Sequence, residues 1–189
     1  MTMTRRALAG AVLAAALLSG LPARAADQFL TIQLKDGPVV IRLRPDIAPK
    51  HVAQIEALAK AGEYDNVAFH RVIDGFMAQT GDVQYGDLEN GYQPSMAGMG
   101  GSTKPDIPAE FSDVPFARGT VGMARSQDPN SANSQFFIMF APGDFLNGQY
   151  TVVGEVVEGM ENVDKIKRGS GGNGEVSDPD RMISVKVGK

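Results

Sequence analysis

Short runs in which hydrophobic and polar residues alternate recur along the chain and predict β-strands. Leu30, Ile32 and Leu34 alternate with polar neighbours, and after an Asp-Gly turn the run 41–44 alternates in the same way, which predicts a β-hairpin with one buried face. Six further strand-like runs, rich in Val, Phe and Met and bounded by Gly, Pro and Asn, are predicted at 67–73, 76–80, 119–125, 135–140, 150–157 and 182–187.

Two segments repeat hydrophobic residues at helical spacing instead. Pro49 suits the first turn of a helix over about 49–61 whose hydrophobic residues share one face. A second helix is predicted around Met160 and Ile166, where acidic residues precede basic ones in the order that suits a helix dipole. Because strands and helices do not alternate, we expect a mainly β fold: a closed antiparallel eight-stranded barrel with the two helices covering its ends.

Residues 83–118 form a long Gly- and Pro-rich stretch without a predicted strand or helix. A connection of that length inside a compact domain is usually either functional or mobile. The sequence does not indicate which.

The first 25 residues have the pattern of a cleavable secretory signal peptide. An arginine pair precedes a hydrophobic stretch over 7–18, and the small-x-small pattern of a cleavage site ends at Ala25. The stretch is shorter than the roughly 20 residues of a membrane-spanning helix, so an anchor is the less favoured alternative. General and twin-arginine export both fit the arginine pair. We expect residues 26–189 to form one domain in the periplasm, or outside the cell if the source has no outer membrane.

Composition and charge exclude several kinds of chemistry. Without the three arginines of the first 25 residues, 15 basic and 22 acidic residues remain, so nucleic acid is not an expected partner. With no Cys there is no disulfide and no thiolate. His51 and His70 are a weak pair for a metal site, Ser134 lacks the Gly-x-Ser-x-Gly motif of a hydrolase, and the glycines at 98–101 lack the Lys of a phosphate-binding loop. We therefore expect no metal and no cofactor.

The segment 69–82, FHRVIDGFMAQTGD, differs from the other strand-like runs. It places Arg71 inside an otherwise hydrophobic strand, and such an arginine needs either an acidic partner or a task at a surface cleft. Strand alternation directs Arg71 and His70 to opposite faces, so the two side chains are not expected to act as one dyad.

Together with GTVGMAR at 119–125 and NSQFFI at 133–138, this segment closely resembles the cyclophilin-type peptidyl-prolyl cis-trans isomerases, and the likeness runs over about 29–187. The resemblance implies that Arg71 is the catalytic arginine and that His70 supports the site from behind. It also implies a proline pocket and peptide groove lined by Phe76, Met77, Gln79, Ala124, Arg125, Gln135, Phe137, Phe145, Leu146 and Tyr150.

Three positions depart from the best-known eukaryotic pattern of this family. Phe145 stands where Trp is common, Tyr150 where His is common, and Arg125 where Asn is common. The first two choices resemble those of periplasmic bacterial members. Because the usual indole donor is missing, strong binding of cyclosporin is not expected.

The resemblance implies an isomerase for exported proteins, without a cofactor. Its expected partners are unfolded or partly folded polypeptides with exposed X-Pro bonds, and we expect a monomer with no membrane contact after signal cleavage. A proline-peptide-binding module or holdase chaperone with incidental turnover is the alternative. A purely structural barrel would require Arg71 to be paired with an acid.

Overall fold

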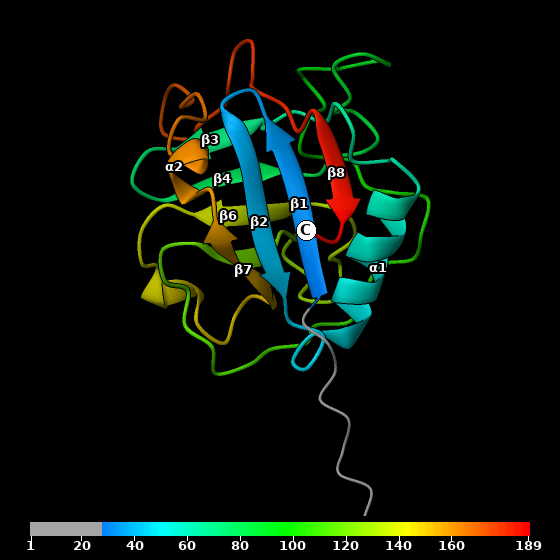
Figure 1. Ribbon diagram of the computed structural model, residues 1–189, viewed down its shortest axis with the longest axis vertical. Helices are drawn as coiled ribbons and strands as arrows, with labels where there is room; N and C mark the ends of the chain where they lie inside the picture. Colours follow the sequence, from blue (N-terminus) through cyan, green and yellow to red (C-terminus); the bar gives the residue numbers. More distant parts are fainter. Residues whose placement is uncertain (1–27) are drawn as a thin grey trace, which may run out of the picture.

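The computed structural model describes residues 28–189, which form one strongly curled antiparallel sheet and two short helices (Figure 1). The signal peptide predicted for residues 1–25 lies outside the described residues. The elements in chain order are β1 (Gln28–Leu34), β2 (Gly37–Leu43), α1 (Pro49–Lys60), β3 (Arg71–Ile73), β4 (Met77–Thr80), β5 (Thr120–Met123), β6 (Phe136–Met139), the 3-10 turn η1 (Asp144–Leu146), β7 (Val152–Glu158), α2 (Met160–Val163) and β8 (Ser184–Val187).

The eight strands are ordered β3-β4-β6-β5-β7-β2-β1-β8 in a sheet with two open ends. The predicted mainly β fold with two helices is confirmed, but the sheet is a curled half-barrel, not the closed barrel that we expected. The strand predicted at 67–73 is confined to β3, because its first residues divide their hydrogen bonds between two segments. The Ala68 amide donates to the Gly86 carbonyl (2.9 Å) and the Phe69 amide to the Asp180 carbonyl (2.8 Å). Only isolated bridges, such as Ala68 with Arg181, link the region before β3 to the region before β8.

The hairpin and the first helix form where the sequence pattern predicts them. β1 pairs with β2 in register from Gln28 opposite Leu43 to Leu34 opposite Gly37. α1 begins at Pro49 and ends one residue before the predicted end. The second helix is shorter than its hydrophobic spacing predicts, because after α2 the Ile166 amide donates to the Val163 carbonyl, a bond to the third residue back that tightens the chain into turns.

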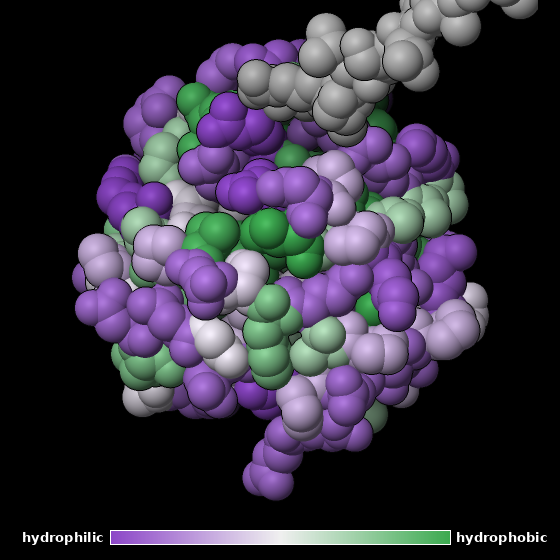
Figure 2. Space-filling view, turned by 90° about the horizontal axis from the view of Figure 1, so that it is seen from below, coloured by the Kyte–Doolittle hydropathy of each residue, from purple (hydrophilic) through white to green (hydrophobic). Residues whose placement is uncertain are grey.

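Two hydrophobic clusters are buried on the sheet. The larger one lies between the sheet and α1 and includes Ile32, Ile41, Ile55 and Phe136. The smaller one consists of the buried side chains of Met77, Phe116, Phe137, Met139, Leu146 and Val152. Neither helix of residues 28–189 has the length and hydrophobicity needed to cross a membrane. Figure 2 shows a largely hydrophilic face on which hydrophobic side chains form a small central patch.

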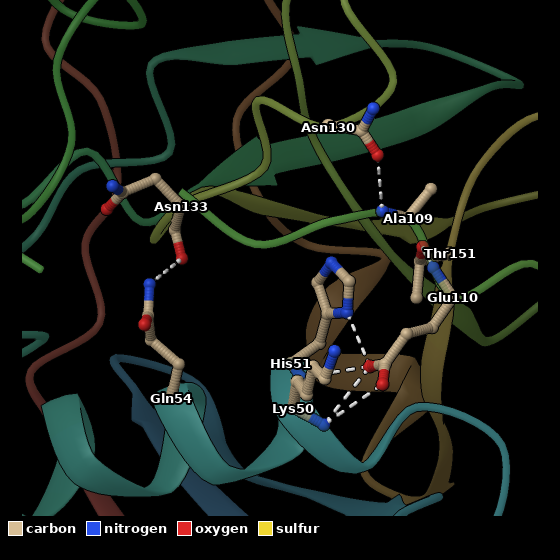
Figure 3. Close-up of polar contacts among 8 residues, drawn as sticks. All are labelled: Lys50, His51, Gln54, Ala109, Glu110, Asn130, Asn133 and Thr151. Atoms are coloured by element: carbon tan, nitrogen blue, oxygen red, sulfur yellow. Dashed lines mark hydrogen bonds and ion pairs between the residues drawn. The ribbon is translucent and has the colours of Figure 1, made fainter. Parts of the chain in front are cut away.

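The long stretch 83–118 is tied to the rest of the chain by two carboxylates. Asp82, which is fully buried, accepts hydrogen bonds from the amides of Gly98 (2.7 Å) and Gly100 (3.0 Å). Glu110 accepts hydrogen bonds from the first amides of α1 and from the His51 ring, as Figure 3 shows. The stretch is therefore anchored near its middle and again near its end.

Candidate functional site

The register of three neighbouring strands brings Arg71, Gln79 and Phe137 into one row. Arg71 of β3 lies opposite Gln79 of β4, and Gln79 lies opposite Phe137 of β6. Residues that are directly opposite each other in antiparallel strands project to the same face of the sheet. A cation, an amide and an aromatic ring are therefore neighbours on one surface.

A chain of side-chain amides orients the Arg71 guanidinium. Arg71 Nη1 donates to Gln79 Oε1 (3.2 Å), and Gln79 Nε2 donates to Gln135 Oε1 (3.0 Å). Gln135 Nε2 in turn donates to the backbone carbonyls of Gly98 (3.0 Å) and Gly100 (2.7 Å). Because each amide uses its oxygen toward one neighbour and its nitrogen toward the next, the orientation of all three side chains is fixed.

In the part of the chain that the structure describes, the charge of Arg71 is not paired with an acidic side chain. The side chain is partly buried, and its Nε donates to the Asn173 carbonyl (3.0 Å). Within residues 28–189, no ion pair joins the guanidinium to a carboxylate. Burial lowers the pKa of Arg71, and Tyr150 opposes this effect. The guanidinium nevertheless stays charged at neutral pH, so its field is available to a ligand.

The smaller hydrophobic cluster forms the floor beside this row. Met77, Phe137 and Leu146 are buried in it, and Phe76, Ala124 and Tyr150 pack against it partly exposed. The Phe137 ring stacks on Phe116 with centroids 5.7 Å apart. Phe145 is 70% exposed and contacts Phe76 at the rim, with ring centroids 5.5 Å apart.

A pocket of about 340 Å³ opens beside the amide chain. Its walls include Gln79, Ala124, Arg125 and Gln135, together with the backbone around Gly98. The structure therefore brings the predicted groove residues to one region: some line this pocket, others belong to or pack against the hydrophobic cluster, and Phe145 contacts Phe76.

Arg125 and Tyr150 form part of the rim of the groove, where Arg125 lines the pocket and Tyr150 packs against the hydrophobic cluster. The Arg125 guanidinium lies over the Tyr150 ring, 4.3 Å from its centroid. Its Nη1 donates to the Ser126 carbonyl (2.8 Å) and its Nη2 to the Gln149 carbonyl (2.9 Å). The arginine at this position is therefore held flat against an aromatic ring.

His70 lies behind the amide chain. It is 5% exposed, lies just before the first residue of β3 and contributes with Arg71 to the wall of a further pocket. That the two side chains face opposite sides stays a prediction. Burial lowers the pKa of His70, and Asp82 opposes this effect, so the ring is neutral at pH 7. A side chain added at Gly98 would approach His70 Cδ2 to 3.0 Å, which shows how closely the ring packs under this loop. The roles predicted for His70 and for the groove residues remain predictions.

Sequence reasoning missed the backbone acceptors of the site. The carbonyls of Gly98, Gly100 and Asn173 hold the amide chain and the guanidinium from the opposite side. Every residue offers a carbonyl, so no side-chain pattern distinguishes these three, and the sequence of 98–101 excluded only a phosphate-binding loop. Within residues 28–189, no group of three or more His, Asp or Glu side chains is placed to hold a metal ion.

Comparison with known proteins gives consistent results. The family model described as "Cyclophilin type peptidyl-prolyl cis-trans isomerase/CLD" matches residues 29–187. The chain is 59% identical over 191 residues to the "Probable peptidyl-prolyl cis-trans isomerase" of Brucella suis, covering 99% of this chain and 97% of the relative. It is 40% identical over 148 residues to "Peptidyl-prolyl cis-trans isomerase B" of Escherichia coli, covering 74% of this chain and 84% of the relative.

A solved structure resembles the whole fold. It is that of a cyclophilin type peptidyl-prolyl cis-trans isomerase of Cryptosporidium parvum in the presence of the dipeptide Ala-Pro. The two chains are 26% identical and superpose with a TM-score of 0.73, over 85% of this chain and 99% of that chain.

Proposed function

This chain belongs to the cyclophilin-type peptidyl-prolyl cis-trans isomerases, and from this premise we propose that it accelerates rotation about X-Pro bonds with Arg71 as the catalytic residue. The observation that carries the proposal is the Arg71 guanidinium, which is partly buried, held by the Gln79 amide and has no carboxylate partner among residues 28–189. A purely structural role would leave this uncompensated charge without a purpose.

The reaction needs stabilisation of a twisted amide and breaks no covalent bond. Rotation about a peptide bond is opposed by a barrier of about 18–20 kcal/mol that arises from delocalisation of the nitrogen lone pair into the carbonyl. In the twisted state this lone pair is localised on the proline nitrogen, so a donor aimed at that atom stabilises the transition state more than the planar ground state. A charged hydrogen bond from Arg71 contributes about 1.5–3 kcal/mol, or roughly ten- to hundredfold in rate.

The hydrophobic cluster supplies a second contribution. A proline ring placed against Phe76, Met77 and Phe137 would be removed from water together with its amide. Since the twisted amide is less polar than the planar one, exclusion of water favours rotation. Gln79 and Gln135 would hold the peptide backbone while the bond turns.

The substrates in this proposal are proline-containing polypeptides that expose their X-Pro bonds. The structure of the C. parvum relative in the presence of Ala-Pro supports this substrate class. The signal-peptide pattern of the first 25 residues supports export, so we place the action of the protein on unfolded or partly folded chains in the periplasm, where it acts as a monomer. Fractionation of cells producing the full chain, with mass spectrometry of the mature N-terminus, is expected to find a protein that begins at Ala26.

The catalytic proposal is tested with Arg71→Ala in a protease-free isomerisation assay on a short X-Pro peptide. Loss of the charged hydrogen bond is expected to lower kcat/KM about ten- to hundredfold, with an unchanged thermal midpoint. Arg44→Ala, which removes a guanidinium that pairs with Asp46, is the matched control and is expected to retain full turnover. Full turnover by Arg71→Ala would show that the assigned mechanism is wrong.

An aggregation assay on an unfolded client, run with the same variants, separates catalysis from the holdase alternative. If Arg71→Ala loses turnover and aggregation suppression together, the isomerase activity accounts for both. Suppression that survives in this variant would assign the binding of unfolded chains to the groove itself.

A further inference from the structure

A second pocket of about 440 Å³ adjoins Arg71, and no predicted role accounts for it. One part of its wall is the site itself, including Arg71 and Gln79. A second part comes from the long stretch 83–118 and includes Tyr92 and Met99, and the third comes from the loop that carries Glu175. The long stretch, for which the sequence indicates no role, thus builds a surface beside the candidate catalytic residue.

This second pocket is continuous with the groove. Gln79 and Met99 line both it and the pocket of about 340 Å³ beside Gln135. The Met99 side chain is 67% exposed, so it is accessible to a peptide bound at either pocket. An extended peptide advances about 3.3 Å per residue, so a chain with its proline beside Arg71 has flanking side chains within reach of the second pocket.

Glu175 places a negative charge in the wall of this pocket. Its backbone forms an isolated antiparallel bridge with Arg71, which puts it directly next to the site. The side chain is exposed, and within residues 28–189 no ion pair is formed by its carboxylate. Burial raises the pKa of Tyr92, and Glu175 adds to this effect, so the phenol and the carboxylate are close together.

The other charged side chain in the wall is Arg71, and two of its three guanidinium nitrogens donate to groups of the protein. Nη1 donates to Gln79, and Nε donates to the Asn173 carbonyl. His70, also in the wall, is neutral because burial lowers its pKa. Because the Arg71 guanidinium repels a cation, a basic group in the second pocket is favoured only beside Glu175, where the wall also offers an aromatic ring and the apolar surface of Pro94.

We propose that the second pocket is a subsite for a basic side chain of the substrate, a Lys or Arg within three residues of the proline. Its charge lies beside Glu175, and its methylene groups pack on Tyr92 and Pro94, as long basic side chains pack on aromatic and apolar surfaces. The inference rests on the proposed function, because it assumes that the proline of the same peptide is bound beside Arg71.

The test compares peptides that carry Lys, Gln or Glu at each of the three positions before and after one proline. With the wild type, we expect kcat/KM for the Lys peptide to exceed that for the Gln peptide by about two- to fivefold, the range of an exposed ion pair. This preference is expected at one position, or at two positions on the same side of the proline. Glu175→Gln is expected to abolish this preference, and Glu175→Lys is expected to transfer it to the Glu peptide. Tyr92→Ala is expected to weaken the preference for Lys without reversing it.

Glu161→Gln is the matched control, because it removes the same charge from an exposed position in α2. It is expected to leave the Lys preference unchanged. A wild type without any preference, or a preference that survives in Glu175→Gln, overturns the subsite. If the wild type turns over none of the peptides, the proposed function fails and not the subsite. The subsite is then tested by the affinities of labelled Lys and Glu peptides, measured by fluorescence anisotropy for the wild type and for Glu175→Gln.

Discussion

Two partly buried polar clusters, one at the start of α1 and one in the groove, differ in how they surround a charged group. At the start of α1, Glu110 accepts hydrogen bonds from two backbone amides and from His51 Nδ1 (2.7 Å), so donors inside the protein satisfy its carboxylate (Figure 3). In the groove, the acceptors of the Arg71 guanidinium are the neutral Gln79 amide and the Asn173 carbonyl. The first arrangement stabilises the fold, whereas the second leaves a charge available to a substrate.

The α1 cluster replaces a cap that the local sequence lacks. Ala48 is the N-cap residue and has no side-chain oxygen, so the first amides of the helix would be unpaired without Glu110. Burial raises the pKa of Glu110, but the hydrogen bonds from His51 and from the amides outweigh this effect and hold it below its ordinary value of 4.5. The cluster therefore favours the ionised carboxylate in the folded protein.

The largest effect is expected for Glu110→Ala. The variant loses a helix cap and leaves a buried ring nitrogen without its acceptor, which together cost about 2–4 kcal/mol of the free energy of unfolding. Urea denaturation measures this cost, and turnover by the remaining folded protein should be unchanged. Arg71→Ala is expected to change the same free energy by less than about 0.5 kcal/mol. An equal loss of stability in both variants would remove the distinction between the two clusters.

A carboxylate placed next to Arg71 in the groove should lower the activity. Gln79→Glu places a carboxylate against the guanidinium of Arg71, so the charge meant for the substrate is compensated internally. Gln79→Leu removes the hydrogen bonds to Arg71 and Gln135 without adding a charge. Loss of the bond to Arg71, about 1 kcal/mol, corresponds to roughly fivefold in rate. We expect kcat/KM to fall at least tenfold for Gln79→Glu and less for Gln79→Leu, with the thermal midpoint of the Glu variant no lower. Greater activity of Gln79→Glu than of Gln79→Leu would contradict this account.

The two clusters also differ in how much of each could be predicted from the sequence. Alternation alone predicted the β1–β2 hairpin, and it placed Arg71 in a strand whose residues differ in burial. The shortening of the 67–73 strand depends on hydrogen bonds to Gly86 and Asp180, which no local pattern contains. The bond between His51 and Glu110 joins positions 59 residues apart, so hydrophobic periodicity could not reveal it.

In the candidate site, too, local patterns were predictable from the sequence and contacts between distant segments were not. The groove side chains could be inferred because whole motifs resemble a family, although strand alternation alone explains why Arg71 and Gln79 can share a face. The second pocket could not be inferred, because its walls come from three segments that only the fold brings together. Local pairing is thus readable from the sequence, and contacts across long connections are not.

The α1 cluster is expected to make stability depend on pH. His51 is fully buried, and burial lowers its pKa below the ordinary value of 6.5, although Glu110 opposes this effect. Because the unfolded chain binds the proton more readily, the free energy of unfolding is greatest above about pH 6.5 and falls as the pH decreases through and below that value. His70, whose pKa is also lowered, acts in the same direction. Urea midpoints measured between pH 5 and pH 8 should fall less steeply for His51→Gln than for the wild type, and equal slopes would exclude His51 as the cause.

The smallest effect is expected at the rim of the groove, for Arg125→Ala. The Arg125 guanidinium lies over the Tyr150 ring and is held by three carbonyls, so it shapes the wall of the pocket. Loss of an exposed cation–π contact of about 0.5–1 kcal/mol corresponds to a rise in KM of roughly two- to fivefold with kcat unchanged. Arg125→Lys keeps the charge but not the planar group, and its KM should lie between those of the wild type and Arg125→Ala. A fall in kcat at constant KM would instead place Arg125 in the chemical step, and the rim could no longer be treated as separate from the groove charge.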